Sequence, residues 1–263
     1  MNQSIYELFN LEGKVAILVG GTGLLGRNYA KVLSAAGARV VIADINKEGC
    51  DQVAKEIMQG NNILARGIET DITNKESVER MVQEVLSEFG KIDILINNAV
   101  ARPPPATVEN YDLENWRKAM GVNLDGVFLC CQIVGKEMTK RGSGVIVNIG
   151  STYGLVSTDH RMYESPDRAS PPVYAASKGG VIQLTRYLAT YWAKKGIRAN
   201  CLIPGGVWNN QDPNFVEKYV EKTPMGRMAR PEEYNGAMLF LCSEASSYMT
   251  GANLVVDGGW TAW

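Results

Sequence analysis

Histidine is almost missing from the sequence, and no cysteine pattern typical of metal binding is present. His160 is the only histidine among 263 residues, and the five cysteines include no Cys-x-x-Cys pair. A zinc site built from several histidines is therefore excluded, and a Ser-His-Asp triad would depend entirely on His160. Because the cysteine count is odd, we expect buried free thiols, a reducing cytoplasmic setting and no metal site.

Long apolar runs and an excess of one charge are missing as well. No apolar run approaches the roughly 18 residues of a membrane-spanning helix, and residues 1–10 lack the regions of a secretory signal. The 27 basic and 28 acidic side chains give a net charge of −1. A basic surface for nucleic acid is not expected from this balance. We therefore expect neither a membrane nor a nucleic acid as a partner.

Short apolar segments alternate with longer segments of helical periodicity along the chain. Segments that are apolar throughout are typical of parallel strands buried on both faces. The expected strands are 14–19, 39–43, 63–68, 92–96, 145–149, 197–203 and 253–256. The expected helices are 24–36, 47–59, 74–89, 113–139, 173–195 and 231–242. This alternation predicts one doubly wound α/β (Rossmann) domain over residues 1–263, with about seven parallel strands and helices on both faces.

Three segments interrupt this alternation, at 100–110, 153–172 and 208–230. Each of them follows an expected strand. Ligands of doubly wound sheets bind outside the carboxyl ends of the strands. We therefore expect these three segments to surround the functional site.

A glycine-rich turn joins the first expected strand to the first expected helix. Gly20, Gly23 and Gly26 are each three residues apart. Such glycines let a pyrophosphate approach the backbone and the helix N-terminus. Asp44 ends the second strand, where a carboxylate accepts hydrogen bonds from the ribose of adenosine and repels a 2′-phosphate. This favours NAD over NADP, while a plain strand–helix turn and helix capping by Asp44 stay open as alternatives.

Tyr174 and Lys178 are four residues apart in the expected helix 173–195, so they lie on one helix face. A nearby ammonium group favours the phenolate form of a tyrosine. A phenolate can act as a general base toward an alcohol. Taken alone, the pair is a weak signal, because helices contain this spacing by chance.

The segment from Tyr174 to Gly179 resembles the active-site helix of the short-chain dehydrogenase/reductase family. Other segments resemble motifs of that family in the same order along almost the whole chain. They are Asp71-Ile72, Asn97-Asn98-Ala99, Val122-Asn123-Leu124, Asn148-Ile149-Gly150-Ser151, Pro204-Gly205-Gly206-Val207, Pro231-Glu232-Glu233 and Val256-Asp257-Gly258-Gly259. The departures are Val19 in place of a threonine, Gly23 one place early, Val100 in place of a glycine, and Asn209 in place of a threonine.

The resemblance implies a reaction mechanism and a set of cofactor contacts. Tyr174 would exchange a proton with the substrate oxygen, and Ser151 would polarise that oxygen. Lys178 would bind the nicotinamide ribose, and Asn123 would hold a water that links Lys178 to solvent. Hydride would pass between substrate and nicotinamide. The expected cofactor contacts are Gly20, Thr22, Gly23, Leu24, Leu25, Gly26, Asp44, Ile45, Asp71, Ile72, Asn98, Ala99, Tyr174, Lys178, Pro204, Gly205, Val207 and Asn209.

The resemblance also implies a homotetramer, with a homodimer as the alternative. The expected helices 113–139 and 173–195 would lie at its interfaces. The apolar tail 260–263 would fit burial against a neighbouring subunit, unless it packs on its own subunit.

Polar side chains in the three interrupting segments indicate the class of substrate. Ser151 and Tyr174 are farther apart than is usual in the family, and the additional residues 157–170, called the insertion below, are polar. Amides suit sugar hydroxyls, and arginine suits phosphate or carboxylate. The candidate substrate residues are Arg102, Arg161, Arg168, Trp208 and Asn210.

These features predict NAD-dependent interconversion of a secondary alcohol and a ketone on a sugar, sugar phosphate or polyol. The insertion and segment 205–211 also resemble, more weakly, dehydrogenases of bacterial surface-sugar and flagellin-glycan pathways. A 3-oxoacyl-thioester reductase is the alternative enzyme, although it would prefer NADPH, which Asp44 opposes. A non-catalytic NAD-binding regulatory protein is the alternative of another class.

Overall fold

Seven parallel strands form one sheet in the order β3-β2-β1-β4-β5-β6-β7. The computed structural model describes residues 4–61 and 63–263. The strands are β1 (Val15–Val19), β2 (Arg39–Asp44), β3 (Ala65–Glu69), β4 (Ile94–Asn97), β5 (Gly144–Ile149), β6 (Ile197–Pro204) and β7 (Asn253–Val256). All seven expected strands are confirmed, with ends shifted by at most two residues.

The strands are apolar throughout because both faces of the sheet are buried. All five residues of β1 are buried. Val15, Ile17 and Val19 point into one hydrophobic cluster, while Ala16 and Leu18 point into another. Successive side chains of a strand point to opposite faces, so a strand covered on both faces cannot alternate apolar with polar residues.

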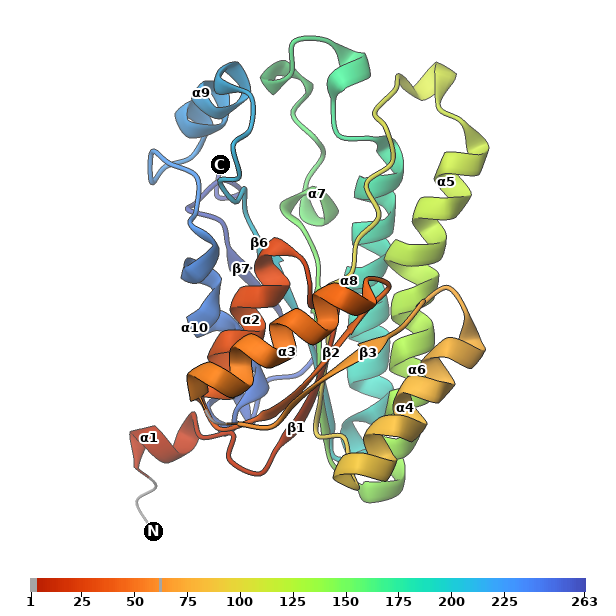
Figure 1. Ribbon diagram of the computed structural model, residues 1–263. Coiled ribbons are helices and arrows are strands. Elements are labelled where there is room, and N and C mark those ends of the chain that lie inside the picture. The colour runs from red at the N-terminus through yellow and green to blue at the C-terminus, as the bar shows by residue number, and fades with distance from the viewer. Residues whose placement is uncertain (1–3, 62) are drawn as a thin grey trace.

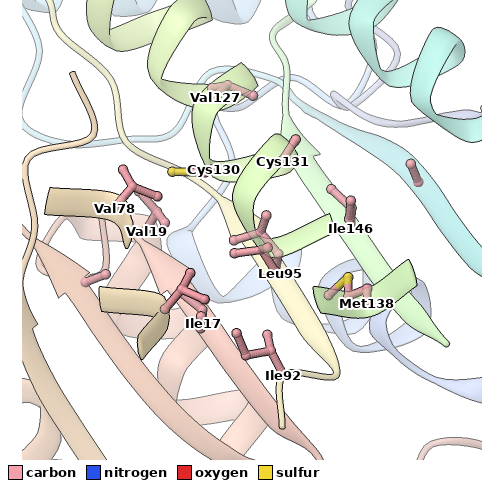
Figure 2. Close-up of a cluster of buried hydrophobic side chains, with 14 of the residues drawn as sticks. Ile17, Val19, Val78, Ile92, Leu95, Val127, Cys130, Cys131, Met138 and Ile146 are labelled. Atoms are coloured by element: carbon pink, nitrogen blue, oxygen red, sulfur yellow. The ribbon is translucent and has the colours of Figure 1, made fainter. Parts of the chain in front are cut away.

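Helices cover both faces of the sheet (Figure 1). One face packs against α4, α6 and α8, and the other packs against α2, α3 and α10. The helices are α1 (Ile5–Leu8), α2 (Leu24–Ala35), α3 (Lys47–Asn61), α4 (Lys75–Phe89), α5 (Leu113–Met120), α6 (Val127–Arg141), α7 (Thr152–Leu155), α8 (Pro172–Trp192), α9 (Pro213–Lys222) and α10 (Asn235–Cys242). Figure 2 shows part of the core on the first face, which includes Val19, Val78, Leu95 and Cys130. Each fully buried aliphatic side chain contributes about 1.5–3 kcal/mol to folding.

The helix expected over 113–139 is present as one continuous helical stretch, but its α-helical hydrogen bonding changes in the middle. A π-helical segment, Gly121–Gly126, separates α5 from α6. A Cβ atom at Gly126 would lie 2.7 Å from the Ile72 side chain, so only glycine fits this approach to the β3–α4 connection. π-Turns are frequent at functional sites because they turn one side chain out of the helical register. Here the segment carries Asn123, which is completely buried.

Several segments expected to be loops contain short helices. Residues 208–230 include α9, whose N-terminus is capped by Asp212 through the backbone N–H groups of Asn214 (2.9 Å) and Phe215 (3.2 Å). Pro213 stands at the first helical position, where its missing N–H costs nothing. An aspartate followed by proline was therefore a helix-start signal that the sequence contained. The short helices α1 and α7 and the 3₁₀ turns Val108–Asn110, His160–Met162 and Pro166–Arg168 were also unexpected.

The remaining helix ends differ in detail from expectation. The helix expected at 231–242 begins with a 3₁₀ turn, Pro231–Tyr234, before α10. The helix expected at 173–195 ends in a 3₁₀ turn, Ala193–Lys195. All five cysteines are buried and free, as expected. Among residues 4–61 and 63–263, no helix has the length and hydropathy that a membrane crossing requires.

Candidate active site

A cavity of about 840 Å³ lies at the carboxyl edge of the sheet. β2 and β3 lie on one side of β1, and β4 to β7 lie on the other, so the strand order reverses between β1 and β4. Doubly wound sheets bind their ligands at such a reversal. Segments 100–110, 153–172 and 208–230 rise above this edge at the top of Figure 1.

Most of the residues predicted from the sequence line this one cavity. The lining includes Gly20, Thr22, Gly23, Leu24, Leu25, Asp44, Ile45, Asp71, Ile72, Asn98, Ala99, Arg102, Ser151, Arg168, Tyr174, Lys178, Pro204, Gly205, Val207 and Asn209. Gly26 and Asn123 are not part of the lining. Arg161, Trp208 and Asn210 lie outside it as well.

The glycine turn brings backbone groups close together at the start of α2. A Cβ atom at Gly20 would lie 2.5 Å from the Ala99 nitrogen, and one at Gly26 would lie 2.4 Å from the Gly20 oxygen. Gly20 also has φ +74°, a conformation that favours glycine. No side chain caps the N-terminus of α2 at Gly23. The first N–H groups of α2 therefore fit an anionic pyrophosphate.

Asp44 is held in place at the end of β2. Its Oδ2 atom accepts hydrogen bonds from the Thr22 backbone N–H (3.2 Å) and hydroxyl (2.7 Å). Its Oδ1 atom accepts one from the Asn46 N–H (3.2 Å). A carboxylate oxygen accepts more than one hydrogen bond, so both oxygens retain capacity for ribose hydroxyls. The Asp44 carboxylate therefore fits the adenosine ribose of a dinucleotide.

Lys178 lies buried one helical turn from Tyr174. Its Nζ donates a hydrogen bond to the Ile149 carbonyl (2.6 Å), and the ammonium is 5.9 Å from the centre of the Tyr174 ring. Burial lowers the pKa of Lys178. The ammonium is therefore fixed behind the tyrosine, and the predicted pair is brought together on the cavity wall.

Ser151 lies two residues after the end of β5 and lines the same cavity. Its Oγ accepts a hydrogen bond from the Tyr153 backbone N–H (3.2 Å), which caps α7. Because that interaction uses a lone pair, the hydroxyl hydrogen can be donated to a ligand oxygen in the cavity. Ser151 is thus both a helix cap and a candidate hydrogen-bond donor, because the two roles use different parts of the hydroxyl group.

Asn123 joins the segment after β4 to α8. Its Oδ1 accepts from the Ala101 N–H (2.7 Å), and its Nδ2 donates to the Ala101 carbonyl (3.1 Å) and the Ser177 hydroxyl (3.4 Å). The side chain therefore holds both backbone groups of Ala101. This positions the start of segment 100–110 beside the cavity; its expected contact to a water stays a prediction.

The structure places only some of the candidate substrate residues at the cavity. Arg102 and Arg168 line the cavity, and Arg168 is paired with Glu164 at 2.6 Å. Arg161 instead makes a bidentate pair with Asp159 (2.7 and 2.8 Å), and its side chain is 89% exposed. An exposed arginine that is neutralised by its neighbour two residues away is turned from the cavity by that pairing.

Aromatic residues that the sequence analysis missed line the cavity as well. Tyr153, Tyr163, Phe215 and Tyr219 line it. The hydroxyl groups of Tyr153 and Tyr163 are 3.2 Å apart, and the Phe215 ring contacts those of Tyr163 (5.3 Å) and Tyr219 (5.9 Å). Burial raises the pKa of Tyr153, which stays a neutral phenol. The i,i+4 spacing of the two α9 residues, Phe215 and Tyr219, was the available signal.

The C-terminal tail packs on its own subunit. Trp260 is 1% exposed and packs edge-on against Tyr153 (5.6 Å) and stacked on Tyr219 (5.9 Å). Lys222 of α9 lies over its ring at 4.0 Å. For Trp260 the expected burial against a neighbouring subunit is therefore wrong. The exposed Trp263 donates its indole N–H to the Lys222 carbonyl (3.1 Å).

Comparison with known proteins identifies the family. A family model described as "Enoyl-(Acyl carrier protein) reductase" matches residues 23–261. The chain is 36% identical over 262 residues to D-threitol dehydrogenase of Mycolicibacterium smegmatis, which covers 96% of this chain and 95% of the relative. The chain belongs to the short-chain dehydrogenase/reductase family. As a member it is an oxidoreductase of CH–OH groups that binds a nicotinamide cofactor.

Other members of the short-chain dehydrogenase/reductase family match over the same length. Galactitol 2-dehydrogenase (L-tagatose-forming) of Cereibacter sphaeroides is 38% identical over 263 residues, covering 97% of this chain and 98% of the relative. The crystal structure of a gluconate 5-dehydrogenase from Burkholderia cenocepacia, in complex with NADP and tartrate, has a TM-score of 0.90 at 33% identity. It covers 99% of this chain and all of that one.

Proposed function

We propose that this enzyme interconverts a secondary alcohol and a ketone on a polyol or sugar, using NAD(H). The observation that carries the proposal is the meeting of Ser151, Tyr174 and Lys178 at one end of a cavity whose other end holds Asp44. The end with Ser151, Tyr174 and Lys178 fits the reacting carbon and is called the substrate end below. The end with Asp44 fits the adenosine ribose and is called the adenosine end. Residues of both groups line one cavity at the carboxyl edge of the sheet, where doubly wound sheets bind their ligands.

The residues of the chain supply the proton chemistry. In oxidation, Tyr174 takes the proton from the substrate hydroxyl, and in reduction it gives that proton to the carbonyl oxygen. Ser151 donates a hydrogen bond to the same oxygen and stabilises its negative charge. Lys178, whose ammonium is held by the Ile149 carbonyl, stabilises the phenolate of Tyr174. The nicotinamide cofactor, when bound, supplies or accepts the hydride.

Asp44 supports NAD over NADP. A 2′-phosphate would lie against its carboxylate, and like charges repel. The nearby cations are already paired: Arg27 with Glu56 (3.4 Å) and Lys47 with Asp51. No unpaired cation among the described neighbours of Asp44 offsets that repulsion, so the adenosine end favours a free ribose.

The lining of the substrate end supports a polyol or sugar. Phenol groups of Tyr153 and Tyr163 and the amides of Asn209 and Gln211 can exchange hydrogen bonds with hydroxyl groups. Aromatic faces can lie against the C–H faces of a carbon chain. Relatives named for threitol and galactitol agree with this class. The 3-oxoacyl alternative requires a channel for an acyl chain, and the polar groups of this lining do not favour one.

A cofactor titration followed by a substrate panel tests the proposal. We expect tighter binding of NADH than of NADPH in a fluorescence titration, and turnover of polyols or sugars rather than 3-oxoacyl thioesters. Tyr174→Phe should lower kcat roughly 10²- to 10⁴-fold, the usual contribution of a general acid–base, and change the affinity for NADH much less. Tyr248→Phe, at a fully exposed tyrosine, is the matched control. NADPH preference with 3-oxoacyl turnover would contradict the proposal.

We further propose that the whole chain is one domain in a cytoplasmic homotetramer. Tyr187 and Tyr191 of α8 stack at 5.8 Å while 62% and 58% exposed, which supports α8 as an interface helix. Buried free thiols support a reducing compartment. Light scattering across a dilution series would measure the assembly, and a monomer would contradict it.

A further inference from the structure

The two ends of the cavity carry opposite charge. Asp44 and Asp71 line the adenosine end, and they are the only acidic residues in the described lining. The end that contains Ser151 and Tyr174 is lined by Arg102, Arg168 and Lys178. No carboxylate of the described lining lies at that end, and a neutral polyol would bring no negative charge to it.

Two of these cations already have partners. Arg168 is paired with Glu164, and Lys178 donates to the Ile149 carbonyl. No hydrogen bond or ion pair joins Arg102 to any other described residue. Arg102 lines the same cavity as Ser151, Tyr174 and Lys178. The pKa of Lys178 is lowered mainly by burial, and Arg102 is a minor cause in the same direction. Arg102 is therefore the cation of this end that is left for a ligand.

Arg102 stands on a restrained backbone. Both backbone groups of its neighbour Ala101 are held by the buried Asn123, at 2.7 and 3.1 Å. Three prolines, Pro103, Pro104 and Pro105, follow it. Proline fixes its own φ and keeps the preceding residue out of the helical region. The guanidinium is thus carried by a segment that loses little entropy when a ligand binds.

We propose that Arg102 binds an oxyanion of the substrate, so that the preferred substrates are acidic sugars or polyols rather than neutral ones. This inference rests on the proposed function and narrows it. A guanidinium presents two parallel N–H groups that match a carboxylate or a phosphate. Because Glu164 neutralises Arg168, Arg102 contributes a single positive charge, which matches the single negative charge of a carboxylate. A phosphate monoester is the other anion that a guanidinium could bind here.

Matched substrate pairs test the inference. Gluconate and glucitol share their carbon skeleton and differ at C1, which is a carboxylate in one and a hydroxymethyl group in the other. We expect kcat/KM with NAD to be at least about tenfold higher for such an aldonate than for its alditol, and KM for the acid to rise with salt. Glucitol 6-phosphate is the third arm, and it distinguishes phosphate from carboxylate as the preferred anion.

Substitution of the arginine completes the test. Arg102→Gln should lower kcat/KM for the acid roughly 10- to 100-fold, as loss of charge-assisted hydrogen bonds does, and leave the alditol within about threefold. Arg102→Lys should restore part of the loss, because a point charge replaces the fork. Arg39→Gln, at the exposed amino end of β2, is the control.

The outcomes separate the inference from the function on which it rests. Equal turnover of aldonates and alditols, with equal effects of Arg102→Gln on both, would overturn the oxyanion site and leave the polyol enzyme intact. An unchanged substrate preference with weaker NADH binding in Arg102→Gln would assign the arginine to the cofactor and also overturn it. If no sugar-class alcohol of either charge is turned over, the proposed function itself fails.

Discussion

The end of the cavity proposed for adenosine is built from backbone turns and strand ends, whereas the end proposed for the substrate is built from side chains of separate segments. Gly20, Gly26 and Asp44 lie within 25 consecutive residues and act through close backbone approach and a fixed strand terminus. Arg102, Tyr163 and Trp260 span most of the chain. The first end is specified locally, while the second exists only after the sheet has brought distant segments together.

The substrate end also has a hydrophobic cluster of its own. Met162, Tyr219, Met228 and Trp260 form it, separate from the two clusters that cover the sheet. The insertion, α9 and the C-terminal tail are therefore packed on one another. Substitutions in this cluster of the substrate end should therefore leave the affinity for the cofactor unchanged.

The largest expected effect on stability comes from Trp260, in the hydrophobic cluster of the substrate end. Trp260→Ala removes a buried ring that packs on Tyr153 and Tyr219. We expect the free energy of unfolding in urea to fall by about 3–5 kcal/mol. Trp263→Ala, at a tryptophan 79% exposed, should change it by about 0.5 kcal/mol or less. A loss of about 0.5 kcal/mol or less in Trp260→Ala as well would show that Trp260 does not stabilise this cluster.

A substitution at the adenosine end should affect the cofactor first. Gly26→Ala places a methyl group 2.4 Å from the Gly20 oxygen, so the turn must shift. We expect a loss of stability of about 1–3 kcal/mol and at least tenfold weaker NADH binding by fluorescence titration. Gly236→Ala in α10 is the control, since its Cβ meets nothing within 4 Å. Unchanged NADH affinity in Gly26→Ala would contradict the proposal that the glycine turn binds the cofactor.

Removal of one charge should alter the choice of cofactor. Asp44→Asn keeps an acceptor for Thr22 but no longer repels a 2′-phosphate. NADH binding should weaken about tenfold, or about 1.4 kcal/mol, and NADPH binding should strengthen. Dissociation constants for both cofactors measure this, with Glu79→Gln on the exposed side of α4 as control. A parallel weakening of both would mean that Asp44 only supports the turn.

The smallest expected effect on stability comes from the two ion pairs of Asp159, one with Arg161 in the insertion and one with Lys222 of α9. Arg161 first, and then Lys222, hold the pKa of Asp159 below its usual value. A carboxyl whose pKa is depressed on folding contributes stability above its unfolded pKa of about 3.9, and this contribution is lost as pH falls further. Asp159→Asn should therefore lower stability by about 0.5–1 kcal/mol at pH 7.

Thermal unfolding measured at several pH values checks this prediction. The difference between Asp159→Asn and the native protein should shrink as the pH falls below about 4. NADH affinity should not change, because Asp159 does not line the cavity. A stability difference that stays constant down to low pH would show that the charge of Asp159 is not the cause.

The predictable features were those fixed by local pattern. The seven strands followed from buried apolar runs, and the glycine turn and Asp44 from their positions at strand ends. The π-segment around Asn123 could not be predicted, because no local pattern marks it, and its Gly126 packs on Ile72 from another segment. The helix α9 was predictable from Asp212 and Pro213 but was obscured by the polar residues around it.

The sequence by itself determined the doubly wound sheet, the glycine turn and the spacing of Tyr174 from Lys178, because each is indicated by a pattern of residues a few positions apart. Only the tertiary structure decided which polar residues reach the cavity. Arg161 and Arg168 belong to the same insertion, yet Asp159 holds the first outside while the second lines the wall. That choice depends on packing and pairing between segments far apart in the chain, which periodicity and motif spacing do not encode.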